Sequence, residues 1–121
     1  MKKVVFITEK SSRGFHTLVA SLNVEAELVF NDGRRYSVAS GNGRSEMVDC
    51  LIVRARDKCR VLSYLTQAFN GISSTCGEAP DVRLFHALER MARSGHWKSM
   101  DEIEGWLTHR GITFSKQKLQ K

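Results

Sequence analysis

The stretch SMDEIEGWLTHRGITFSKQKLQK, residues 99–121, decides the fold that we predict for the C-terminal part of this chain. Ser99 and Glu102 have the spacing of a capping box, in which each side chain satisfies a free backbone N–H of the other residue. Gly111 suits the left-handed position that ends a helix, and Ser115 can cap a further helix. The stretch therefore predicts a helix, a tight turn and a short, basic final helix.

Another helix is predicted upstream, from Asp81 to about Ser94. Its apolar residues repeat at helical spacing along one face. They are Val82, Phe85, Leu88 and Ala92. Residues 72–80 are rich in small and polar residues and predict a linker before this helix. Residues 81–121 are thus expected to form a tri-helical unit.

Alternating residues in the N-terminal half predict a β-hairpin. Apolar and polar side chains alternate from Val24 to Phe30 and again at Tyr36 and Val38, as in a sheet with one buried face. Asn31-Asp32-Gly33-Arg34 lies between the two runs, and Asp-Gly favours the tight turn of a hairpin. The aromatic residues Phe30 and Tyr36 would pack under a helix or, alternatively, stack on single-stranded bases.

The other N-terminal segments predict a small sheet with helical cover. Lys3–Thr8 and Met47–Ala55 are apolar, β-branched runs typical of strands. Phe15–Leu22 fits either a short helix or a strand. Asp57 can cap a helix that extends to Phe69. About four strands and one or two helices are therefore expected in this part of the chain.

The predicted fold class is α+β, a small antiparallel or mixed β-sheet with one or two covering helices, followed by a C-terminal three-helix unit. We predict a sheet module for dimerisation or partner binding over residues 1–71, a linker over residues 72–80 and a helix-turn-helix-like unit over residues 81–121. A chain of 121 residues is long enough to bury one hydrophobic core.

The pattern E-I-x-x-W-L-x-x-x-G-I-x-x-S-x-x-x-L over residues 102–119 resembles the helix-turn-helix of winged-helix repressors, those of the arginine-repressor type among them. In that family a capped helix ends at a glycine, and the next helix enters the major groove of DNA. The resemblance covers residues 81–121. It departs from the family because the sequence ends at Lys121, so that no wing is expected after the third helix.

This resemblance implies a set of DNA contacts on the third helix and around it. The side chains that would read bases in the major groove are Lys116, Gln117, Gln120 and Lys121. The side chains that would contact phosphates are Lys98, Arg110, Thr113, Ser115 and Lys118. The alternative is that the Lys- and Gln-rich terminus is a solubilising tail.

The charge of the chain suits an anionic partner or an ordinary solvated surface. The net charge is +6 and the pI is about 9.6, which favours nucleic acid over an acidic partner. Cys50, Cys59 and Cys76 lack paired spacing and are expected to be reduced thiols in a cytoplasmic protein. No apolar run approaches the roughly 18 residues that would predict a membrane span.

Two other motifs admit a catalytic interpretation. Gly41-Asn42-Gly43-Arg44 is either a phosphate-binding loop or a flexible connection, and it lacks the spacing of a P-loop. Val4–Lys10 resembles the strand and glutamate that open a Toprim domain. The second acidic pair of that family is missing, since Asp49 precedes its strand and Asp57 stands alone. The four histidines show no zinc-site spacing.

Together these patterns predict a non-enzymatic, cytoplasmic DNA-binding protein that acts as a transcriptional or replication regulator. Its C-terminal helices would bind double-stranded DNA, and its sheet module would form a homodimer or bind a protein partner. No cofactor, metal or membrane is expected. Two alternatives stay open. One is a protein-binding adaptor or inhibitor whose helical unit docks on a partner, and the other is a small nucleic-acid-processing enzyme that uses Glu9 and Asp49.

Overall fold

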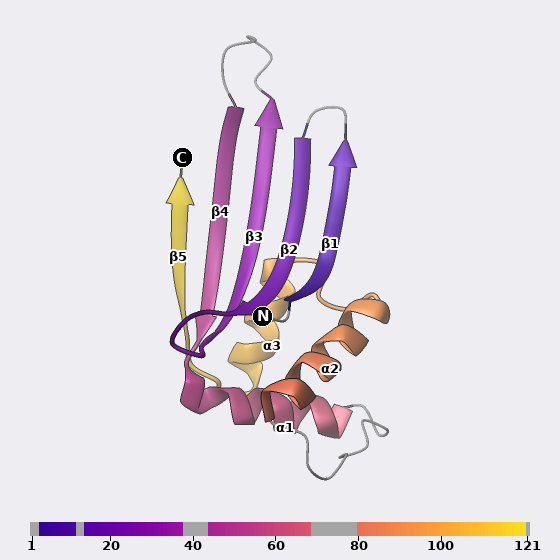
Figure 1. Cartoon of the computed structure of the whole chain (residues 1–121), viewed down its shortest axis with the longest axis vertical. Helices are drawn as coiled ribbons and strands as arrows, with labels where there is room; N and C mark the ends of the chain where they lie inside the picture. The colour runs from indigo at the N-terminus through magenta and orange to yellow at the C-terminus, as the bar shows by residue number, and fades with distance from the viewer. Residues whose placement is uncertain (1–2, 12–13, 38–43, 69–79, 121) are drawn as a thin grey trace.

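The fold, obtained as a computed structural model, combines a five-stranded antiparallel sheet with three helices gathered at one end (Figure 1). The structure describes residues 3–11, 14–37, 44–68 and 80–120. The strands are β1 (Lys3–Ser11), β2 (Gly14–Leu22), β3 (Leu28–Ser37), β4 (Arg44–Val53) and β5 (Phe114–Gln120), and they lie in that order in the sheet. The helices are α1 (Lys58–Ala68), α2 (Pro80–Arg93) and α3 (Met100–His109), with a 3-10 turn, η1 (Ala55–Asp57), before α1.

The C-terminal segment is a strand, so the predicted fold class with a C-terminal three-helix unit is wrong. Instead of a helix from Ser115, the chain forms β5, which pairs antiparallel with β4 and places Phe114 opposite Val53. Tertiary pairing overrides the favourable helix propensity of lysine and glutamine. Without β5, the N–H and C=O groups along one side of β4 would be unpaired. The alternating lysines of β5 suit an edge strand, because charged side chains discourage pairing with the edge of another chain. The three helices therefore lie between β4 and β5 in the sequence.

The predicted hairpin turn is also displaced along the chain. Asn31-Asp32-Gly33-Arg34 lies inside β3, paired with both β2 and β4, and the turn instead joins β2 to β3. There the side-chain oxygen of Asn23 accepts hydrogen bonds from the backbone N–H groups of Glu25 (3.0 Å) and Glu27 (2.9 Å), a common role for asparagine in turns. The Asp-Gly dipeptide of β3 has the sequence of a turn, but in the fold Asp32 is buried within the strand.

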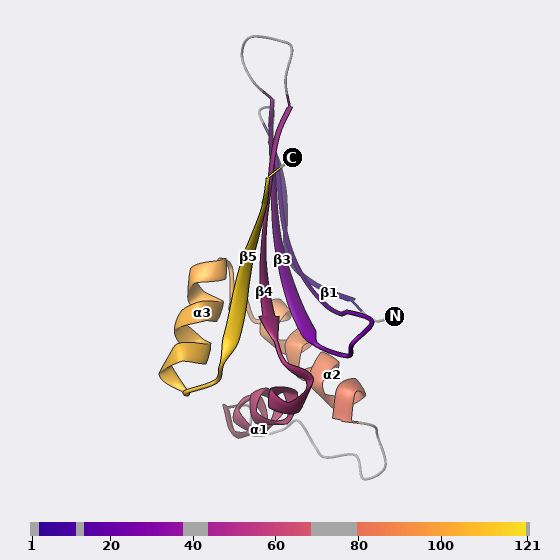
Figure 2. The ribbon, with the colours of Figure 1, turned by 90° about the vertical axis from the view of Figure 1, so that its left-hand side faces the viewer.

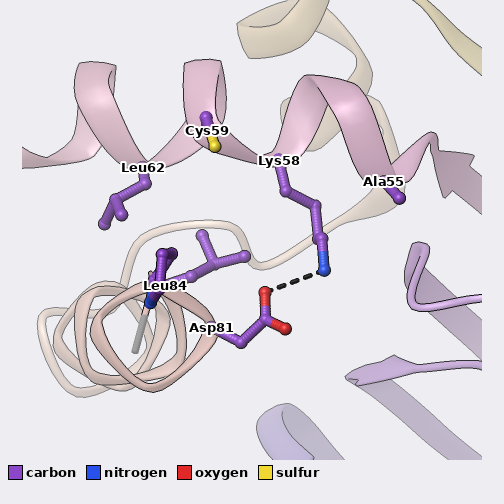
Figure 3. Close-up of a pocket in the computed structure, with 7 residues that line it drawn as sticks. Ala55, Lys58, Cys59, Leu62, Asp81 and Leu84 are labelled. Atoms are coloured by element: carbon purple, nitrogen blue, oxygen red, sulfur yellow. Dashed lines mark hydrogen bonds and ion pairs between the residues drawn. The ribbon is translucent and has the colours of Figure 1, made fainter. Parts of the chain in front are cut away.

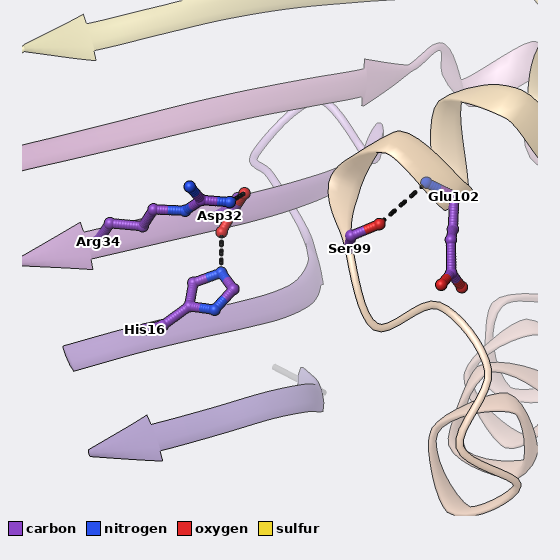
Figure 4. Close-up of polar contacts among 5 residues, drawn as sticks. All are labelled: His16, Asp32, Arg34, Ser99 and Glu102. Carbon is purple, nitrogen blue, oxygen red and sulfur yellow. Dashed lines mark hydrogen bonds and ion pairs between the residues drawn. The ribbon is translucent and has the colours of Figure 1, made fainter. Parts of the chain in front are cut away.

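Several local predictions agree with the structure. Lys3–Thr8 lies within β1, and the choice left open for Phe15–Leu22 resolves to a strand, β2. The hydroxyl of Ser99 caps α3 by accepting a hydrogen bond from the backbone N–H of Glu102 at 3.2 Å (Figure 4). Gly111 takes a positive φ of 69° just after α3, which is the conformation expected of a C-terminal glycine cap.

One hydrophobic core lies between the helices and one face of the sheet. The ring of Trp97, which follows α2, lies 5.7 Å from the rings of Phe6 and Phe30, centroid to centroid. This contact ties the connection between α2 and α3 to the strands. The core therefore draws on both residues 1–71 and residues 81–121, while most of the predicted linker lies outside the described residues.

The two faces of the sheet differ in their cover. Figure 2 shows the sheet edge-on, with α3 against one face and α1 and α2 at its lower end. No helix or strand of the described residues packs on the opposite face (Figure 2). The strands also extend past the helices (Figure 1). No helix in the described part of the chain is both long enough and apolar enough to cross a membrane.

Candidate functional site

We call the uncovered side of the sheet the open face and the helix-packed side the covered face. Successive residues of a strand point to opposite faces, so the buried core residues fix which residues belong to each. The described open-face residues are Lys3, Val5, Thr8 and Lys10 of β1; Phe15, Thr17, Val19 and Ser21 of β2; Val29, Asn31, Gly33 and Arg35 of β3; Val48, Cys50 and Ile52 of β4; and Ser115 and Gln117 of β5.

One cross-strand row of the open face places an aromatic ring between two cations. Lys10 pairs in register with Phe15, and Phe15 pairs with Arg35. Directly opposed residues have Cβ atoms about 4.5–5.5 Å apart, so the three side chains are neighbours on one surface. Phe15 is 37% exposed. The next position in the row is Glu46 of β4, whose side chain is outside the described part of the structure.

A hollow of about 300 Å³ lies beside this row. It is lined by Phe15, Thr17, Val19, Asn31, Gly33, Arg34, Arg35 and Val48. Gly33 opens the hollow because it carries no side chain, and a Cβ at this position would lie 3.2 Å from Oγ1 of Thr17. The open face is therefore concave at its centre, with an aromatic ring, two valines and several polar groups around the depression.

Asn31 has a defined orientation beside the hollow. Its side-chain oxygen accepts a hydrogen bond from the Cys50 thiol at 2.9 Å. Burial raises the pKa of the Cys50 thiol, and the nearby Asp49 carboxylate raises it further. The thiol therefore stays protonated at neutral pH and remains a donor. The amide NH₂ of Asn31 is then the end of the side chain left to meet a ligand.

The open face also presents apolar side chains to solvent. Val5 is 52% exposed, and Val19, Val48 and Ile52 are only partly buried. A solvated face of an antiparallel sheet normally carries polar residues, and exposed apolar patches mark binding surfaces. The open face therefore combines partly exposed apolar side chains with the basic residues of the Lys10–Phe15–Arg35 row.

The covered face carries charges that pair with one another. The buried carboxylate of Asp32 lies 2.6 Å from Nε2 of His16 and 3.7 Å from the guanidinium of Arg34 (Figure 4). Lys116 of β5 forms an ion pair with Glu104 of α3 at 2.8 Å. The hydrogen bond that Lys116 donates to the Glu104 carboxylate raises the pKa of Lys116. These cations are directed to carboxylates of the protein itself.

The acidic groups of the covered face do not assemble a metal site among the described residues. One carboxylate oxygen of Asp49 is buried with no hydrogen-bond partner in the described structure, and Asp32 and Lys118 are its register neighbours. The described residues contain no group of three or more side chains that could hold a metal ion. Glu9 of β1 is separated from Asp49 by β2 and β3, so the structure does not bring together the acidic pair considered for a nucleic-acid-processing enzyme.

A second hollow, of about 260 Å³, lies between α1 and the start of α2 (Figure 3). Its main polar contact is the ion pair from Nζ of Lys58 to Oδ1 of Asp81 at 2.8 Å. Lys58 is buried, whereas Cys59 on the next position of α1 is exposed. The ion pair joins the two helices across the hollow and explains how a lysine is accommodated there.

The structure distributes the predicted DNA-contact residues over several surfaces. Lys98 and Thr113 are exposed in the connections on either side of α3. Arg110 is the C-cap that follows α3. Its guanidinium lies 4.2 Å from the ring centroid of Trp106 and donates a hydrogen bond to the Trp106 carbonyl oxygen at 3.2 Å. That cation–π contact gives Arg110 a packing role within the protein.

The remaining predicted contacts lie on β5 and are divided by its alternation. Lys116 and Lys118 are on the covered face, whereas Ser115 and Gln117 are on the open face. Gln120 pairs in register with Met47; its side chain, and the whole of Lys121, lie outside the described part of the structure.

The row of Lys10, Phe15 and Arg35 is missing from the sequence-based prediction because its members come from three strands. The alternation of Phe15, Thr17 and Val19 was available as a signal for β2, but only the register shows their neighbours.

No family model matches the chain, and neither a curated protein nor a solved structure matches it.

Proposed function

We propose that this protein is a non-enzymatic DNA-binding protein that holds single-stranded DNA against the open face of its sheet. The observation that carries the proposal is the cross-strand row in which Lys10 and Arg35 flank the exposed ring of Phe15. An aromatic ring offers a stacking surface for a base, and cations beside it can meet the phosphates.

The form of the surface favours a single strand over a duplex. Bases of single-stranded nucleic acid can lie flat on aromatic side chains of an exposed sheet, as in common single-strand-binding modules. The segment that was expected to enter a major groove is strand β5. The proposal therefore keeps DNA as the ligand and assigns the contact to the sheet in place of the C-terminal helices.

Charge supports the same assignment. The net charge of the chain is +6, and the described charged side chains of the open face are Lys3, Lys10 and Arg35. Cations that contact phosphates release condensed counterions, so that affinity falls as salt concentration rises. Each such contact on a single strand contributes about −0.7 to the slope of log K against log salt.

The test is fluorescence anisotropy with a labelled single strand of about 15 nucleotides, near the upper end of known site sizes. Phe15→Ala is expected to weaken binding about tenfold, within the ~1–3 kcal/mol range of base–aromatic stacking. The control is Lys118→Gln, because Lys118 is an exposed cation on the covered face. The affinity of this variant for the single strand should stay within about twofold of the wild-type affinity.

Equal losses in both variants, or no binding by the wild-type chain even at low salt, would overturn the proposal. Sedimentation of the same samples addresses the alternative that a second copy of the chain covers the apolar groups of the open face. Self-association would be the better explanation of the open face if the wild-type chain were a dimer that dissociates in Phe15→Ala and if it had no affinity for single strands.

A further inference from the structure

We infer that the hollow over Gly33 is a subsite for one DNA base and that it selects thymine over adenine. This inference rests on the proposed function, since it assigns base preference to the same open face. It begins from the size of the hollow. Its volume of about 300 Å³ is at the lower limit of ligand pockets, which suits a single base better than a larger group.

The hollow and the Lys10–Phe15–Arg35 row share Phe15 and Arg35. A strand whose phosphates meet the cations of this row would therefore have a neighbouring base within reach of the hollow. Gly33 makes that approach possible, because even a Cβ there would lie 3.2 Å from Oγ1 of Thr17 and would fill part of the depression.

The walls of the hollow suit the apolar part of thymine. Val19 and Val48 lie on either side of Asn31 and Gly33 in the neighbouring strands, and both valines line the hollow. Thymine is the DNA base that carries a methyl group on its ring, and apolar side chains are its usual contact in proteins. Adenine presents no equivalent apolar group.

The polar groups of the hollow supply donors. The Cys50 thiol occupies the side-chain oxygen of Asn31 at 2.9 Å, which fixes the amide and leaves its NH₂ as a donor. The hydroxyl of Thr17 can donate as well. Thymine offers two carbonyl acceptors and no amino group, whereas adenine offers ring-nitrogen acceptors beside an amino donor, so fewer of its polar groups match the two donors of the hollow.

The experiment compares oligothymidylate with oligodeoxyadenylate of equal length by anisotropy, using the wild-type chain and Asn31→Leu. Leucine keeps the approximate size of asparagine and removes the donor. The wild-type chain should bind oligothymidylate more tightly, and Asn31→Leu should reduce this preference about fivefold, the effect of one hydrogen bond. Ser21→Ala is the matched control, because Ser21 is on the open face of β2 but does not line the hollow.

The variant separates base recognition from self-stacking of oligodeoxyadenylate, because self-stacking would give the same preference in both proteins. An unchanged preference in Asn31→Leu therefore overturns the subsite while leaving the open face as the DNA-binding surface. No binding of either oligonucleotide by the wild-type chain overturns the proposed function itself. If far-UV circular dichroism shows that Asn31→Leu does not fold, Gly33→Ala provides the second test, because its methyl group fills part of the hollow. An unchanged preference for oligothymidylate in Gly33→Ala also overturns the inference.

Discussion

The open and covered faces are built from alternate residues of the same strands, yet the described carboxylates of these strands all lie on the covered face. In β3, Asp32 and Arg34 lie on the covered face, whereas Asn31 and Arg35 lie on the open face. The carboxylate of Asp32 on the covered face, and that of Glu104 on α3, meet cations at ion-pair distances. The described charged side chains of the open face are basic and lie beside an exposed aromatic ring. The sheet thus keeps its described carboxylates on the helix side and presents cations and apolar groups where a partner can approach.

The largest expected effect separates two phenylalanines on opposite faces. Phe30 of β3 is fully buried on the covered face and packs against Trp97, whereas Phe15 of β2 is 37% exposed on the open face. Phe30→Ala should lower the free energy of unfolding by about 3–5 kcal/mol, the usual cost of emptying an aromatic core site. Phe15→Ala should lower it by about 1 kcal/mol or less. Urea denaturation monitored by circular dichroism measures both.

The same pair of variants can break the comparison between the faces. If Phe15→Ala destabilises the chain as strongly as Phe30→Ala, the open face is part of a folded interface and is not a free surface. Repeating the denaturation at several protein concentrations would then show whether a second copy supplies that interface, because only self-association makes the midpoint depend on protein concentration.

A smaller effect concerns the salt dependence of DNA binding. The double variant Lys3→Gln and Lys10→Gln, at two exposed open-face cations of β1, should make the slope of log K against log salt shallower by about 1.4, or about 0.7 for each lost phosphate contact on a single strand. The double variant Lys116→Gln and Lys118→Gln removes the same charge from the covered face and should leave the slope unchanged. Anisotropy titrations between about 50 and 200 mM salt measure both slopes. Equal changes in the two variants would mean that net charge, and not the open face, controls binding.

Local chemistry made part of this fold predictable. The β-branched run of β1, the apolar spacing of α2 and the Ser99 cap of α3 all depend on residues close together in sequence. Asp32 and Gly33 predicted a turn because that dipeptide favours turns in isolation. The structure uses Asp32 as the buried partner of His16 and Gly33 as the open centre of a sheet, and both uses depend on neighbouring strands.

The strand β5 and the candidate site could not be predicted for the same physical reason. The stretch from Ser115 to Lys118 consists of residues that a helix tolerates well, and its pairing partner β4 lies on the other side of three helices in the sequence. The row of Lys10, Phe15 and Arg35 likewise exists only once three strands are set in register. Local patterns carry no information about register between distant segments.

The smallest expected effect tests the orientation of Asn31 through the titration of Cys50. Burial and Asp49 raise the pKa of Cys50 above its ordinary value of 9.0. As the pH rises above 9.0, the Cys50 thiol loses its proton in the unfolded chain before it does so in the folded chain. The unfolded state then binds fewer protons than the folded state, so the free energy of unfolding falls as the pH rises. Cys50→Ser keeps a donor for Asn31 but removes the titration, so its free energy of unfolding should fall less than that of the wild type as the pH rises above 9.0. The exposed Cys59 gives the control, Cys59→Ser, which should follow the wild-type pH dependence. If Cys50→Ser follows it too, the Cys50 thiol is not held in the protonated, donating state that fixes Asn31.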